Sequence, residues 1–303
     1  MTKGPAGLRA GPVVRPPERD RFDLRGERAV LATMHGKERV IAPLLGRFLG
    51  LRVETVVGFD TDRFGTFTRE VPRPGSQLDA ARAKIAAAFA HAPGARVAVA
   101  SEGSFGPDPI VPFAPLGVEI VLLADRATGI EIVGRFADLE AAWTHSVVTD
   151  IAAAVAFADR VGFPAQGVVV AGCEGRLPRP DLGLFKEIGG RADLERAVGA
   201  VIARCGAAVV ETDMRAHRNP RRMRAIARAT VTLIRNVGNR CPRCDRPGLV
   251  VTERLPGAPC AACGTPTRVI RAEAATCAGC GHRIEVRAGP PTADPGLCDA
   301  CNP

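Results

Sequence analysis

The sequence is poor in aromatic residues: among 303 residues it has no Tyr and a single Trp, and aromatic residues make up 4%. Proteins that bind single-stranded nucleic acid by stacking need exposed rings, so this scarcity argues against a stacking platform. No stretch approaches the roughly 20 uncharged apolar residues that a membrane span requires. The amino terminus is rich in Arg and Pro and lacks the apolar core of a secretory signal. We therefore expect a cytoplasmic protein that does not contact a membrane.

Lysine is scarce as well, since the chain has 4 Lys and 37 Arg. The formal net charge of +9 lies entirely in residues 215–303, which hold 15 Arg and 6 acidic residues, whereas residues 1–214 are balanced. The preference for Arg over Lys fits a bias in genomic base composition, so it does not by itself indicate RNA binding. With 46% hydrophobic and 24% charged residues, the chain has the composition of a globular protein that buries a core.

The chain divides into three parts. Residues 1–28 contain four prolines and no apolar period, which predicts a disordered leader. Residues 29–238 alternate strand-like and helical patterns and predict an α/β domain. Within it, residues 118–124 and 129–134 read as a hairpin, so we expect a mixed sheet flanked by helices. Residues 239–303 are expected to form a double zinc-ribbon tail with two four-cysteine sites.

The tail prediction depends on four CxxC pairs. One CxxC turn presents two thiolates to a tetrahedral ion, and a second turn completes the ligand set. In a reducing compartment such pairs indicate metal rather than disulfides. The spacing favours two structural Zn²⁺ sites made from successive pairs, with interleaved pairing as the open alternative. The expected ligands are Cys241, Cys244, Cys260, Cys263, Cys277, Cys280, Cys298 and Cys301.

An arginine-rich segment precedes the tail: residues 215–240 hold eight Arg and no acidic residue. On a helix starting near Pro220, four of these arginines form a narrow arc opposite an apolar face. Such a stripe would neutralise the phosphates of a nucleic acid or a nucleotide. The alternative is the solvated face of an amphipathic helix. The four arginines are Arg221, Arg224, Arg228 and Arg235.

Short polar clusters follow three predicted strands, which is where α/β folds place ligands. In the first, a glycine turn leads into a helix and brings backbone N–H groups and Lys37 toward an anion. The second contains Glu102, which follows a buried strand at the start of an expected turn-rich loop. In the third, Glu211 and Asp213 share one strand face and would either hold Mg²⁺ or pair with Arg215 in a structural cluster.

Segments that contain these residues resemble two protein families. The runs ATMHGKERVIAPLL, GFDTDRFGTFTREVPRPGS and ETDMRAHRNPRRM, followed by cysteine pairs, resemble an uncharacterised bacterial family known as a domain of unknown function. That resemblance covers nearly the whole chain beyond residue 29 and implies no activity.

The order of four short motifs is similar to the house-cleaning nucleoside triphosphate pyrophosphatases, the inosine-triphosphatase and Maf group. The similar segments are Ala32–Lys37, Asp79–Lys84, Glu102–Ser104 and Ala216–Arg218. His35 and Ala80 stand where that group has Asn, and one acid of its acidic pair is missing.

This second resemblance implies a Mg²⁺-dependent hydrolase of a phosphorylated small molecule, with a nucleotide as the first candidate. The residues expected to act on the phosphates, the metal or the water are Lys37, Lys84, Asp79 and Glu102. Those expected to bind the rest of the substrate are His35, Arg215, His217 and Arg218. The competing hypothesis is a protein that binds nucleic acid or another protein through the arginine helix and zinc ribbons, with the α/β domain as a non-catalytic scaffold.

Overall fold

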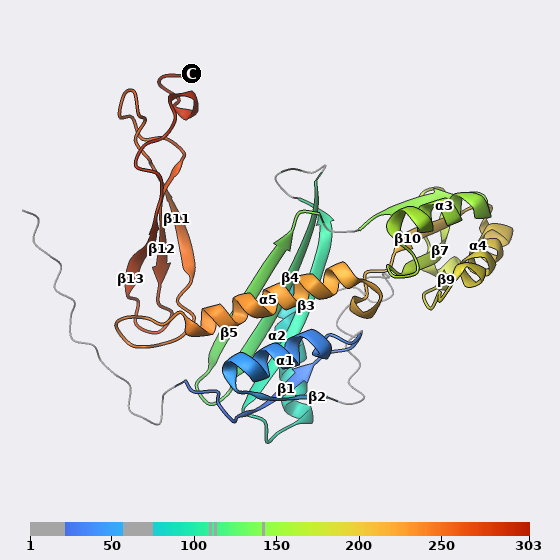
Figure 1. The fold of residues 1–303 in the computed structure, drawn as a ribbon, viewed down its shortest axis with the longest axis horizontal. Helices are drawn as coiled ribbons and strands as arrows, with labels where there is room; N and C mark the ends of the chain where they lie inside the picture. The colour runs from blue at the N-terminus through green and yellow to red at the C-terminus, as the bar shows by residue number, and fades with distance from the viewer. Residues whose placement is uncertain (1–21, 57–74, 109–110, 112–113, 141–142) are drawn as a thin grey trace, which may run out of the picture. The chain divides into compact units, whose positions relative to one another are not determined.

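A computed structural model describes residues 22–56, 75–108, 111, 114–140 and 143–303 (Figure 1). The chain forms two units. The large unit comprises Leu24–Ile234, and the tail unit comprises Arg235–Pro303 together with the residues up to Asp23. This division falls close to the predicted start of the tail at residue 239.

The first sheet of the large unit has the strand order β2-β1-β3-β4-β5. Strand β1 pairs in parallel with β2 and with β3, whereas β3, β4 and β5 form an antiparallel meander. The predicted hairpin and the mixed sheet are therefore confirmed. The strand bounds are β1 Arg28–Ala32, β2 Arg52–Thr55, β3 Val97–Pro107, β4 Pro115–Asp125 and β5 Ile130–Asp138.

Three helices belong to this sheet: α1 (Glu38–Leu49), α2 (Gln77–His91) and α5 (Pro220–Gly238). The Ala-rich face of α2 packs on one face of the sheet, with Ala81, Ile85 and Ala88 in a shared apolar core. Helix α5 runs across the sheet (Figure 1). It crosses β5 at Gly134, where an added Cβ would lie 2.1 Å from the carbonyl oxygen of Ala229.

A second, antiparallel sheet holds β6 (His145–Val148), β10 (Ala208–Thr212) and β7 (Val168–Glu174), with two-residue strands β8 (Leu177–Pro178) and β9 (Leu184–Phe185) on β7. Helices α3 (Ile151–Val161) and α4 (Arg191–Cys205) pack against it. The mixed α/β class is confirmed, but the strands divide over two sheets rather than one. Strands β6, β8 and β9, of two to four residues each, carry too little period to be recognised in the sequence.

Two local predictions were wrong. The segment from Ser101 was expected to be a turn-rich loop, yet β3 continues to Pro107 because every residue from Val97 onward pairs with β4. Residues 24–28 are not disordered either: Leu24 is buried, and the N–H of Gly26 donates to the carbonyl of Gly50. Residues 1–21 of the predicted leader and most of the polar run 58–75 lie outside the described residues.

The tail unit contains the antiparallel sheet β11-β12-β13. Its strands are β11 (Val251–Pro256), β12 (Ile270–Thr276) and β13 (Arg283–Ala288). Across the described part of the chain, no helix combines the length and the apolar character that crossing a membrane needs.

Candidate functional site

Five charged side chains are buried together in the large unit. They come from the start of α1, from α2, from β3, from β4 and from α5, so residues far apart in the sequence meet. Their exposed fractions are 6% for Lys37, 6% for Lys84, 5% for Glu102, 1% for Glu119 and 3% for Arg222. Burying a charge is costly unless it is paired and hydrogen-bonded, so this charged cluster needs a specific arrangement.

The charged cluster surrounds the end of β1. The β1–β3 pairing stops at Ala32 and Ala100, and β3 carries on beyond it. Alternation along β3 and β4 places Glu102 on the face packed by α2 and Glu119, paired in register with Gly103, on the face crossed by α5. Ligands of α/β folds bind beyond the carboxyl ends of parallel strands, and this is such a position.

Four of the five charges form two ion pairs. The Lys84 ammonium contacts the Glu102 carboxylate. On the other face, Nε of Arg222 donates to Oε1 of Glu119 at 2.6 Å, and the same guanidinium donates to the carbonyl of Met214. Each carboxylate is thus compensated by at least one cation.

Lys37 is the fifth charge and lacks such a partner. It directly precedes α1 and follows His35 and Gly36, which both have positive φ (66° and 73°). Its ammonium donates to the backbone carbonyl of Ser101 at 3.2 Å, and no carboxylate of the described residues forms an ion pair with it. The hydroxyl of Ser101 is also buried and makes no hydrogen bond with any residue that the structure describes. An anion at this place would satisfy both groups.

Burial, reinforced by the nearby charges of Arg222 and Lys84, lowers the pKa of Lys37 from 10.5 to about 7. The carboxylates of Glu102 and Glu119 act in the opposite direction but do not compensate. The charges of the other four members therefore all act on Lys37, whose charge changes near neutral pH.

The polar segment that contains His217, the third one predicted, lies against the segment that contains His35, the first one predicted. The rings of His35 and His217 stack, with centroids 5.0 Å apart and planes inclined by 20°. A Cβ added to Gly36 would lie 3.8 Å from the Cβ of His217. Burial, together with the charge of Arg215, lowers the pKa of His217. Because His35 precedes Gly36 and His217 lies against it, the two histidines flank the loop that leads to Lys37.

Arg215 and Arg218 bind the segment 186–188 through an ion pair and hydrogen bonds. Arg215 pairs with Asp213 at 2.7 Å and with Glu187, and it donates to the carbonyl of Lys186. Arg218 donates to the carbonyl of Ile188. Asp213 therefore belongs to a salt-bridge cluster with Arg215, which was the structural alternative in the prediction. Both arginines are bound by groups of the protein itself.

Asp79 lies apart from the charged cluster. Its carboxylate accepts hydrogen bonds from the N–H of Ser76 at 3.0 Å and from the Ser76 hydroxyl at 2.6 Å, which completes a capping box at the start of α2. The side chain is 59% exposed. The structure thus gives Asp79 a role in helix capping rather than a place beside Lys37 and Glu102.

Glu119 and Arg222 were not predicted as site residues from the sequence. Glu119 was read as part of an apolar strand, and Arg222 as one arginine among many. Their signal is positional: Glu119 lies on a strand whose other residues from Gly117 to Asp125 are all buried. Arg222 precedes Ile226 by four residues and so points to the buried side of α5. In both cases a charged residue stands at a position where the pattern predicts a buried apolar one, and this is the signal in the sequence.

The predicted arginine stripe is only partly free for a ligand. Arg221 binds Asp138 of β5 through two hydrogen bonds of 2.7 Å, and Arg228 lies over the ring of Phe136. Arg224 and Arg235 are exposed. Two of the four arginines therefore hold α5 to the sheet.

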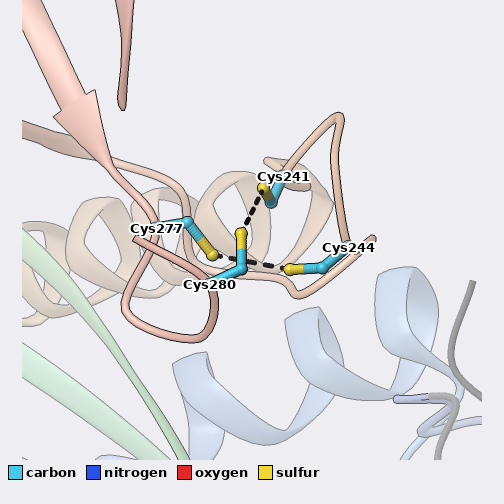
Figure 2. A group of neighbouring side chains, drawn as sticks. All are labelled: Cys241, Cys244, Cys277 and Cys280. Atoms are coloured by element: carbon cyan, nitrogen blue, oxygen red, sulfur yellow. Dashed lines mark hydrogen bonds between the residues drawn. The ribbon is translucent and has the colours of Figure 1, made fainter. Parts of the chain in front are cut away.

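All eight predicted cysteines fall into two groups that could hold a metal ion. The first cysteine group is Cys241, Cys244, Cys277 and Cys280 (Figure 2), and the second is Cys260, Cys263, Cys298 and Cys301. Sγ–Sγ separations between paired turns are 3.6 to 3.8 Å in both groups. A tetrahedron with metal–sulfur bonds of about 2.3 Å has edges of about 3.8 Å. Both groups thus fit closed four-thiolate sites in a double zinc-ribbon tail.

Pairing of successive CxxC turns was wrong, and the interleaved alternative is correct. A single strand, β11, lies between the first and second turns, and its six residues span about 20 Å. A single strand likewise separates each later turn from the next. In an antiparallel meander successive turns lie at opposite ends, so the first meets the third and the second meets the fourth.

Three of the turns share one backbone pattern. The first cysteine of each donates its N–H to the carbonyl five residues on at 2.9 Å, and the residue after the second cysteine has positive φ. Glycine adopts that conformation without strain, and it occupies two of these three positions. The residues with positive φ are Asp245 (61°), Gly264 (75°) and Gly281 (69°).

Comparison with known proteins places this architecture in a family. No curated protein matches the chain. Residues 87–303 match the family described as Domain of unknown function (DUF6671), a range that includes Glu102, Glu119, Arg222 and all eight tail cysteines. Because this match covers well over half of the sequence, the chain belongs to the family Domain of unknown function (DUF6671).

Proposed function

We propose that the large unit is a hydrolase that acts on a phosphorylated small molecule, with a nucleotide as the first candidate. The observation that carries the proposal is the buried ammonium of Lys37, which has no carboxylate partner among the described residues and lies at the Ser101 carbonyl. The unsatisfied Ser101 hydroxyl adds a second donor at the same place. A phosphate oxygen would accept from both groups.

The charge of the cluster supports an anionic ligand. Among the described residues of the cluster, three cations face two carboxylates, and because Lys84 and Arg222 are paired, the excess positive charge of this set resides on Lys37. An approaching phosphate would stabilise the charged form of Lys37 and raise its pKa again. The start of α1 contributes further, because the first N–H groups of a helix favour an anion.

The carboxylates fit a divalent cation that arrives with the substrate. Mg²⁺ is usually bound through one or two carboxylates together with substrate phosphates. Glu102 and Glu119 are the carboxylates of the cluster, and Oε2 of Glu119 is buried without a hydrogen bond from the described residues. When bound, the ion would neutralise charge that develops on the phosphoryl oxygens.

The remaining residues would position these groups. Arg222 fixes one oxygen of Glu119 and leaves the other available. Lys84 holds Glu102 from the α2 side. The exposed ring of His217, stacked on His35, offers a planar face to a base. In this proposal Asp79, Arg215 and Arg218 stabilise the fold and do not contact the substrate.

The test uses the full chain with Mg²⁺ and a panel of nucleoside triphosphates, and measures released phosphate and pyrophosphate. Glu102→Gln should lower turnover by about 100-fold or more, because it removes a carboxylate that would bind the divalent cation, and the cation stabilises charge at the reacting phosphate. Glu131→Gln is the matched control, because Glu131 is an exposed carboxylate that also pairs with a cation, Arg82 at 2.8 Å. Equal turnover in both variants, or no hydrolysis of any phosphorylated substrate, would contradict the proposal.

We infer further that zinc occupies both cysteine groups. Four thiolates in a tetrahedron are a ligand set that zinc favours, and a closed set gives the ion a structural role. Elemental analysis should find two zinc ions per chain. Cys277→Ser and Cys298→Ser should each lose one ion, whereas Cys173→Ser, outside both groups, should keep two. Loss of both ions in either ligand variant would contradict two independent sites.

The competing function, binding of nucleic acid through α5 and the tail, is supported by Arg224 and Arg235, which are exposed and form no ion pair with described residues. Binding of a DNA duplex that weakens steeply with salt, and is lost in an Arg224→Ala, Arg235→Ala variant but retained in Lys37→Met, would favour this function.

A further inference from the structure

The two cysteine groups differ in how far the protein covers them. In the first group Cys241 and Cys277 are buried, and Cys244 and Cys280 are half-buried. In the second group Cys260 and Cys298 are equally buried, but Cys263 and Cys301 are exposed. The difference therefore lies in the second cysteine of each pair.

Apolar packing accounts for the protection of the first group. Leu249 and Ala275 are buried against its cysteines, and Ile284 packs against the same core. Strand β12 supplies Ala275 and strand β13 supplies Ile284, so these two strands cover the first group. At the second group, Cys263 instead has a polar neighbour, with its Sγ 3.3 Å from the Thr265 hydroxyl.

Other features of the two groups are alike. The sulfur separations agree within 0.2 Å, between 3.6 and 3.8 Å. Each group also has a backbone N–H directed at a buried sulfur, from Gly279 to Cys277 at 3.3 Å and from Ala262 to Cys260 at 3.4 Å. Solvent access is thus the variable that separates them, and oxidation of thiolates follows thiolate character and access.

We propose that the second cysteine group is an oxidation site, at which a hydroperoxide forms a disulfide and releases the metal ion while the first group keeps its own. The inference rests on the proposed occupancy of both groups by zinc. Its substrate class is a small hydroperoxide such as hydrogen peroxide, which reaches Cys263 from solvent.

The reaction transfers two electrons from two thiolates to the peroxide. The Cys263 thiolate attacks one oxygen of the peroxide, an S–O bond forms, the O–O bond breaks, and the second oxygen leaves as hydroxide. The thiolate of Cys298, whose Sγ lies 3.7 Å from that of Cys263, then attacks the sulfenic sulfur. An S–S bond forms and a second hydroxide leaves. With two protons from solvent the two hydroxides become two waters, and Zn²⁺ leaves unchanged in oxidation state.

The experiment uses the full zinc-loaded chain. Hydrogen peroxide is added in the presence of a chromophoric zinc chelator, and the cysteines are then alkylated in denaturant and mapped by mass spectrometry. One equivalent of zinc should appear at least 10-fold faster than the second. At that stage a Cys263–Cys298 disulfide should be present, while all four cysteines of the first group should be alkylated.

Paired variants supply the control. Cys244→Ser, which should lack the ion of the first group, should retain the fast phase, whereas Cys263→Ser, which should lack the ion of the second group, should release zinc only in the slow phase. Release of both ions at one rate, or oxidation of the first group before the second, would overturn the proposal. A starting preparation without zinc would instead refute the metal assignment, so the two failures are distinguishable.

Discussion

A side chain at position 103 would overlap the guanidinium of Arg222, and Gly103 leaves that space free. A Cβ added to Gly103 would lie 2.6 Å from a terminal nitrogen of Arg222 and 2.7 Å from Oε1 of Glu119. The ion pair between β4 and α5 can form only because the facing position on β3 has no side chain. The absence of a side chain at this glycine therefore shapes the charged cluster.

We expect Gly103→Ala to separate Arg222 from Glu119 and to lower the free energy of unfolding by about 3 kcal/mol, because a broken buried ion pair leaves uncompensated charges. Chemical denaturation measures this effect. Gly106→Ala in the same strand is the control, since nothing lies within 4 Å of its added Cβ. If the two variants lose the same stability, the close approach at Gly103 is not what matters.

Lys37 should make stability depend on pH. Its pKa is about 7 in the folded protein and 10.5 in an unfolded chain, so the unfolded state binds more protons between these values. The free energy of unfolding of the wild type should therefore rise with pH across that window. Lys37→Met lacks this cost, so it should be more stable than the wild type by a few kcal/mol at pH 6, and the difference should shrink toward pH 10. Denaturant titrations at several pH values measure it, and a difference that does not change with pH would refute it.

Sequence patterns predicted those features that depend on local chemistry. One example is the start of α2, where the Ser76 hydroxyl accepts from the N–H of Asp79 in a capping box, a motif of neighbouring residues. The CxxC spacing predicted all eight cysteines of the two groups. Lys37, Lys84 and Glu102 were singled out from strand ends and a helix motif, and they meet.

The features that were missed depend on tertiary pairing. Gly103, Gly106 and Pro107 read as turn residues, but the long pairing with β4 overrides their local preference. Connectivity of the cysteine pairs depends on whether one strand or two separates successive turns, which their spacing does not encode. Glu119 and Arg222 form one pair across 103 positions of sequence, and each becomes informative only when the other is placed beside it.

Asp79 provides a test of the capping role against a catalytic one. Its hydrogen bonds with Ser76 lower its pKa. Asp79→Ala should therefore reduce stability slightly at neutral pH, and the deficit should vanish as the pH falls and the wild-type carboxylate is protonated. Turnover under the conditions used for Glu102→Gln should remain at the wild-type level. A loss of turnover like that of Glu102→Gln, at unchanged stability, would restore Asp79 to the catalytic group.

Metal removal should unfold the tail unit and spare the large unit. The apolar core identified around the first cysteine group is small, with Leu249, Ala275 and Ile284 packed among the cysteines, so the tail depends on its ions. The large unit has two extensive apolar cores of its own and no metal ligand among the eight cysteines. After treatment with a chelator at neutral pH, limited proteolysis should cleave within residues 241–303 while leaving a stable fragment that contains β3, β4 and α4. Adding zinc back should restore resistance of the tail. Simultaneous degradation of both units would show that the large unit depends on the tail, and it would contradict their separate stabilisation.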